Sequence, residues 1–298
     1  VDRGRERHAL FGRPPASLML VLPFLGILAQ TKEKQCEGKD LRSANGLAGC
    51  TSLNFQFDPL SAAEITAVAK AVSGGEIAVL ICRGCELGAA GMDVLGPALL
   101  SQDSISFMTL REDVLGATGA NYIAQLLNQS KTLTGLDLRS AGLEVDDSAL
   151  ATALRHPDSV LQILNLKVSG LGPVGSANVA SALAVNRELQ WLDLSFTGLG
   201  DEGAALLAAA LAERDEGLTL HLEDRSLSEE GLAALQRLKK EQPRHEILLP
   251  PEMFKPQHRM PRRGRPSALG NEKLSALEAA AAAADPDGTM DGMLKTEL

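Results

Sequence analysis

Apolar positions recur along this chain in one template, L-x-x-L-x-L-x-x-x-x-L, whose alternating leucines have the period of a β-strand. Seven copies follow one another in phase, at an interval of 27 residues once and of 28 residues thereafter. The copies start at Cys50, Ile77, Ile105, Leu133, Leu161, Leu189 and Gly217. A repeat of this length predicts a solenoid, in which each unit buries its apolar face against the next.

The sixth copy shows what each unit should contain. Leu192 and Leu194 mark the buried side of a short strand, and Leu199 returns the chain to the core. Asp201 and Glu202 then open a helix, where the helix dipole favours negative charge. Apolar residues follow at helical spacing. Each unit is therefore predicted to be a strand followed by a helix.

Stacking such units should curve the chain. Neighbouring strands lie about 4.8 Å apart, whereas packed helices need about 10 Å. We therefore expect the strands on a concave face and the helices on a convex face, with residues 28 apart side by side. A last strand is expected at 245–249, ended by Pro250 and Pro251, because proline has no N–H for the strand ladder.

The segment from Leu199 to Ala204 reads Leu-Gly-Asp-Glu-Gly-Ala after its template. This combination resembles the leucine-rich repeats of the ribonuclease-inhibitor type, and the resemblance covers residues 50–249. It implies an α/β fold: a right-handed leucine-rich-repeat solenoid of horseshoe shape, with parallel strands on the concave face. The asparagine that this family carries in its turns is largely absent here, so we expect less regular turns.

The ends of the chain differ from the repeats. Residues 1–30 form a basic and apolar leader, residues 31–49 an N-terminal cap, and residues 250–298 a mostly disordered tail with a short Ala-rich helix. The repeat domain between them holds seven units and the terminal strand.

Two interpretations of the leader remain open. Its basic segment and short apolar run resemble a secretory signal peptide, and the run is shorter than the roughly 20 residues needed to span a bilayer. Alternatively, Leu22, Leu25 and Ile27 form a capping strand one period before the first template.

The last four residues, from Lys295 to Leu298, resemble the Lys-Asp-Glu-Leu address for retention in the endoplasmic reticulum, with Thr296 in place of the acid. Together with the leader, this ending predicts the lumen of the endoplasmic reticulum or the secretory pathway. A cytoplasmic location is the alternative.

Charge narrows the range of partners. The net charge is −9, and residues 46–249 carry 26 acidic against 14 basic residues. An acidic body argues against nucleic-acid binding, which needs a basic footprint. We expect a monomer with a protein partner, no stable membrane span and no cofactor.

Strand positions between the buried leucines should face the concave side, because side chains alternate along a strand. Four consecutive units place a cation at the third such position, and we name these residues the cation row: Arg83, Arg111, Arg139 and Lys167. The first position carries large apolar groups, and we name three of them the apolar row: Phe107, Ile163 and Trp191.

Two interpretations of these rows stay open. Arginine forks suit carboxylates, and aromatic and arginine side chains are typical anchors of interfaces, so the rows predict binding of an acidic, partly apolar protein segment. The alternative is a solvated face whose cations are balanced locally by Glu112, Asp137 and Asp193.

The four cysteines do not form a metal motif. Cys82 and Cys85 make a C-x-x-C, but both fall on positions that point into the core, and no second pair has metal spacing. We interpret them as small buried hydrophobes. Cys36 and Cys50 flank the start of the solenoid and are suited to a capping disulfide in a secreted chain.

No catalytic pattern stands out. The histidines are scattered, and phosphate-loop, G-x-S-x-G and H-E-x-x-H motifs are missing from the sequence. We therefore expect a non-enzymatic protein-interaction module. The alternatives are a GTPase-activating protein of the Ran type, a function that occurs with this repeat type, and a sensor-repeat fragment of a larger receptor.

Overall fold

The structure is a computed structural model that describes residues 34–41, 43, 46–143 and 148–249. The chain divides into two units, Val1–Met253 and Phe254–Leu298, and all described residues belong to the first. The leader, the Ala-rich helix and the C-terminal signal lie outside the described residues.

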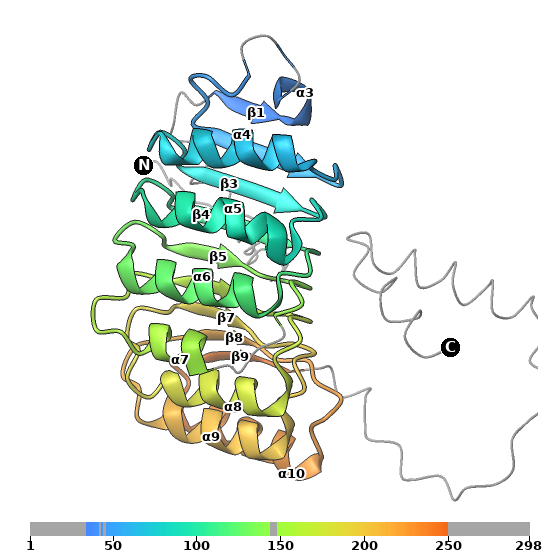
Figure 1. Ribbon diagram of the computed structural model, residues 1–298. Helices are drawn as coiled ribbons and strands as arrows, with labels where there is room; N and C mark the ends of the chain where they lie inside the picture. Colours follow the sequence, from blue (N-terminus) through green and yellow to red (C-terminus); the bar gives the residue numbers. More distant parts are fainter. Residues whose placement is uncertain (1–33, 42, 44–45, 144–147, 250–298) are drawn as a thin grey trace, which may run out of the picture. The chain divides into compact units, whose positions relative to one another are not determined.

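Strands and helices alternate along the described chain, and the strands form one nine-stranded sheet in sequence order, with every neighbouring pair parallel. The helices line up in a separate layer along the sheet (Figure 1). The strands are β1 (Gln35–Glu37), β2 (Ser52–Gln56), β3 (Val79–Arg83), β4 (Phe107–Arg111), β5 (Gly135–Asp137), β6 (Ile163–Asn165), β7 (Trp191–Asp193), β8 (Thr219–His221) and β9 (Glu246–Leu248). The helices are α3 (Gly38–Leu41), α4 (Ala62–Ser73), α5 (Gly88–Leu100), α6 (Gly116–Gln129), α7 (Ser148–Leu154), α8 (Gly172–Ala182), α9 (Gly200–Ala212) and α10 (Glu229–Glu241).

The prediction of repeated strand–helix units in a parallel sheet is confirmed. Residues one period apart pair across the sheet, for example Val79 with Phe107 and Ile163 with Trp191. The template leucines of successive units line one shared interior, in which Leu136, Leu164 and Leu192 are fully buried. None of the described helices has the length and apolarity that a membrane crossing requires.

The N-terminal edge of the described sheet, β1, lies within the predicted cap of residues 31–49. β1 pairs with β2, Cys36 lying opposite Leu53, and Cys36 forms a disulfide with Cys50. Both interpretations of residues 1–30 lie outside the described residues, and each stays a prediction. The anticipated Cys36–Cys50 bond is present, and it holds β1 in place.

The turns after the strands are more regular than expected. In six consecutive units, the residue after the cation-row position or its equivalent has a left-handed backbone with φ between 53° and 59°; these residues are Phe57, Gly84, Glu112, Ser140, Val168 and Phe196. Carboxylates supply part of the missing asparagine bonding. Asp113 accepts the N–H of Leu87 at 2.8 Å, and Asp224 accepts the N–H of Gly198 at 2.7 Å. Our expectation of irregular turns was wrong, because aspartates and backbone bonds between units take over the role.

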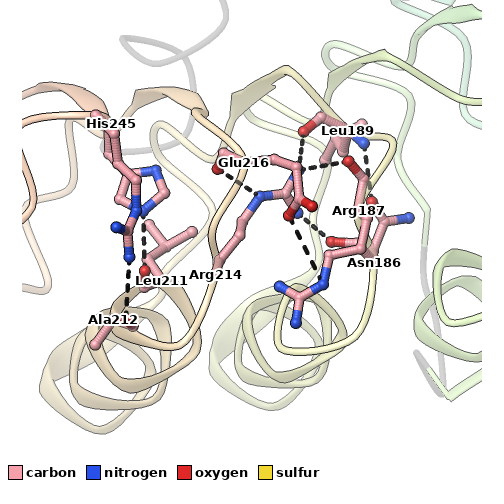
Figure 2. A network of polar contacts seen from close by, with 9 residues as sticks. Asn186, Arg187, Leu189, Leu211, Ala212, Arg214, Glu216 and His245 are labelled. Carbon is pink, nitrogen blue, oxygen red and sulfur yellow. Dashed lines mark hydrogen bonds and ion pairs between the residues drawn. The ribbon is translucent and has the colours of Figure 1, made fainter.

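Arg214, which follows α9, ties its unit to the loop between α8 and β7, as Figure 2 shows. Its side chain is 0% exposed, and the guanidinium donates to the backbone carbonyls of Asn186, Arg187 and Leu189 in the preceding unit. Burial lowers the pKa of this guanidinium, and Glu216 opposes the shift. A buried arginine thus supplies donors to backbone carbonyls of the loop that joins α8 to β7.

His245 plays a similar role in the last unit (Figure 2). Its Nδ1 accepts the N–H of Leu218 at 3.2 Å, and its Nε2 lies 2.9 Å from the carbonyl oxygen of Leu211. This pattern fits a neutral ring that carries its proton on Nε2. Burial lowers the pKa of His245, which favours the same neutral form.

Candidate protein-binding face

The apolar row lies on the open face of the sheet, the face whose side chains point away from the template leucines. Strand register places Phe107, Gly135, Ile163 and Trp191 on successive strands. The ring of Phe107 occupies the space above Gly135, since a Cβ there would lie 2.4 Å from Cδ2 of that ring. The row is therefore continuous, with Phe107 5% exposed and the other two large side chains half-buried.

The cation row is also brought together as predicted. Arg83 and Arg111 pair in register on β3 and β4. Beyond the shorter β5 and β6, the backbone ladder continues: the N–H of Glu112 donates to the carbonyl of Arg139 at 3.0 Å, and that of Ser140 to Lys167 at 2.9 Å. Four consecutive units thus carry the row along one line of the open face.

Part of this charge is balanced locally, as the alternative interpretation predicted. Nε of Arg83 lies 2.8 Å from Oε1 of Glu112, and Nε of Arg111 lies 3.7 Å from Oδ2 of Asp137. Asp193 differs from that expectation, because its Oδ1 accepts the backbone N–H of Ser195 at 2.8 Å.

Arg111 retains unused donors. Its side chain is 15% exposed, and among the described residues its buried Nε and Nη2 have no hydrogen-bond partner. Burial lowers the pKa of Arg111, although the charge of Asp137 opposes that shift. Burial likewise raises the pKa of Asp137 against the influence of Arg111 and Arg139. The pair is thus desolvated without close hydrogen bonding.

Side chains at the middle outward-facing position of β5 and β6 fix the backbone at two of the four cations, a role not predicted from the sequence. Asp137 accepts the N–H of Arg139 at 3.0 Å, and Asn165 accepts the N–H of Lys167 at 3.0 Å. Such bonds, from a side chain to the backbone two residues ahead, fix the chain locally. The signal was present in the sequence as Asp or Asn two residues before Arg139 and Lys167, whereas Ile81 and Thr109 stand two residues before Arg83 and Arg111.

Two phenylalanines flank the cation row, and the sequence analysis missed both. Cζ of Arg83 lies 4.4 Å from the ring centroid of Phe57, and Nζ of Lys167 lies 5.5 Å from that of Phe196. These are cation–π distances. Phe57 is 60% exposed, so core burial does not account for its ring. The 28-residue period could have revealed both phenylalanines, because each directly follows the third outward-facing position of its strand.

The aromatic surface continues from β7 to β8. The rings of Trp191 and His221 have centroids 5.1 Å apart at a tilt of 50°. Burial lowers the pKa of His221, which favours an uncharged ring beside the indole. The register places Thr219 beside Trp191 and His221 beside Asp193, so the neutral imidazole contacts the indole from the middle position of β8.

The cysteine pair next to Arg83 requires a correction. Cys82 and Cys85 are buried as expected, but they are bonded to each other and are not two separate thiols. The carboxylate of Asp113 lies with the two sulfurs in a group spanning at most 4.8 Å. The two sulfurs are bonded to each other, and the carboxylate of Asp113 accepts the backbone N–H groups of Cys85 and Leu87. Together these bonds close the loop that holds Arg83.

A pocket of about 390 Å³ lies elsewhere, between the N-terminal cap and α4, where Leu47, Lys70 and Ile77 line it. None of the residues that line it belongs to the cation row or the apolar row.

Set against known proteins, the sequence matches no family model and no curated relative. Functional inference therefore depends on the geometry of the open face.

Proposed function

We propose that this protein is a non-enzymatic interaction module that binds an acidic, partly apolar protein segment on its open face, through the cation row and the apolar row. Arg111 carries the proposal. Two of its buried nitrogen atoms lack a hydrogen-bond partner within the described chain, although a guanidinium normally fills its donor sites when desolvated. Because both atoms are buried, a carboxylate from a partner would supply the missing acceptors once the guanidinium turns toward the open face.

The arrangement of like charges supports the same proposal. Unit charges on adjacent strands repel by roughly 0.8 kcal/mol per pair even in water. Folding gains nothing from four such neighbours in an otherwise acidic body. Glu112 and Asp137 offset part of this repulsion, and an acidic partner would offset the rest.

We further propose that the repeats are leucine-rich repeats of the ribonuclease-inhibitor type, forming a right-handed horseshoe with the open face on its concave side. The 28-residue period and the parallel register support this assignment. We also propose that the protein enters the secretory pathway. Its two disulfides support that location, because such bonds persist in oxidising compartments.

A selection from a random peptide library tests the function. Wild-type protein should enrich sequences rich in Asp and Glu with interspersed apolar residues. The Arg111→Gln/Arg139→Gln variant should lose that enrichment, because the substitution removes charge without adding like charges beside Asp137. Arg237→Gln serves as the matched control, since Arg237 is exposed on α10. Equal enrichment by all three proteins would remove the proposal.

A further inference from the structure

The spacing of the cation row selects the conformation of a bound segment. Neighbouring strands lie about 4.8 Å apart, so the three steps from Arg83 to Lys167 cover about 14 Å. On an α-helix, residues i, i+3, i+7 and i+10 form one stripe, and ten residues rise about 15 Å. On an extended chain, four side chains on one side span about 20 Å. A helix laid across the strands therefore matches the row, and an extended segment overshoots it.

The distance between the two rows points the same way. Phe107 and Arg111 stand four residues apart on β4, so the rows are separated by about 13 Å along the strands. An α-helix with its side chains is about 10–12 Å wide. One helix can therefore contact the cation row along one flank and Ile163 and Trp191 along the other.

The flanking phenylalanines mark the ends of such a helix. Phe57 and Phe196 lie five strand steps apart, about 24 Å, which is the length of about 16 helical residues. Both have left-handed backbones, which are unfavourable for bulky residues, whereas Gly84 occupies the equivalent position without that cost. Phenylalanine thus occupies two positions at which glycine would suit the backbone better.

We propose that the open face binds an acidic α-helix of a partner protein, lying across the strands with one carboxylate per turn against the cation row and an apolar side chain at each end against Phe57 and Phe196. This inference rests on the proposed function and specifies the conformation of the segment that is bound.

Two peptides of identical composition test it. One has Glu at i, i+3, i+7 and i+10 with a Leu one turn beyond each end, on an Ala and Gln background. The other places the same Glu residues at every second position. Binding is measured by calorimetry and by the fluorescence of Trp191, the sole tryptophan of the chain. We expect the first peptide to bind at least about tenfold more tightly and to change the emission.

The outcomes separate the two proposals. If the alternating peptide binds equally well or better, the proposed helical conformation of the bound segment is wrong, whereas the binding of an acidic segment stands. If neither peptide binds, both proposals fall.

The ends of the helix are tested by Phe57→Gly and Phe196→Gly, which keep the left-handed turns accessible. Each should weaken the helical peptide about threefold or more. Val185→Gly is the control, because Val185 is 58% exposed in the turn after α8. Wild-type affinity in both phenylalanine variants would overturn the placement of the ends.

Discussion

Replacing Arg214 by methionine should lower the free energy of unfolding by about 2–4 kcal/mol. Methionine keeps most of the apolar volume but donates no hydrogen bonds, so the carbonyls of Asn186 and Leu189 lose their buried donor. An unsatisfied buried acceptor costs about 1–3 kcal/mol. Two such groups are partly offset, because the variant no longer buries a charge.

Urea denaturation followed by circular dichroism measures this change. With a slope of about 2 kcal/mol per molar urea, the midpoint should fall by about 1–2 M. Arg214→Lys should lie between the variant and the wild type, since one ammonium group reaches fewer carbonyls than a planar fork.

The neighbouring Arg187 provides the control. Its Nε lies 3.7 Å from Oε2 of Glu216, and both side chains are at least 40% exposed, so Arg187→Met should cost less than about 1 kcal/mol. If Arg214→Met lowers the midpoint no more than Arg187→Met does, the buried guanidinium is not what joins these units.

Two further predictions concern pH and packing. Because burial lowers the pKa of His245 below the usual 6.5, the unfolded chain takes up a proton first, so stability should fall as the pH drops below about 6.5. His245→Gln should flatten urea midpoints measured between about pH 7.5 and 5.5, and an unchanged slope would contradict this. Gly135→Ala should cost about 1–3 kcal/mol in thermal melts, because its Cβ meets the Phe107 ring. The cost should vanish in a Phe107→Ala background, and additive costs would contradict the contact.

The repeat was predictable because burial dictates it. Each unit must hide its template leucines, and only one register aligns Leu136, Leu164 and Leu192 in a shared interior. That register also places the cation row and the apolar row, since side chains alternate along the strands. The two rows were therefore predictable to the individual residue.

The chemistry around the rows was not predictable from the period. Phe57 contacts Arg83 because the turn adopts a left-handed conformation, which depends on bonds between units rather than on local propensity. The pairing of Arg83 with Glu112 depends on side-chain reach across neighbouring strands. The sequence suggests that Arg214 is a surface charge, whereas its side chain is buried against the loop between α8 and β7 of the preceding unit.

The bond between Cys36 and Cys50 has a consequence for solubility. A strand at the rim of a sheet exposes unpaired N–H and C=O groups, which recruit strands from other molecules. β1 covers that rim of β2 with three residues only, and the bond closes a loop of 14 residues that keeps it there. A reductant would release this cover, so the reduced protein should self-associate end to end while its inner repeats remain folded.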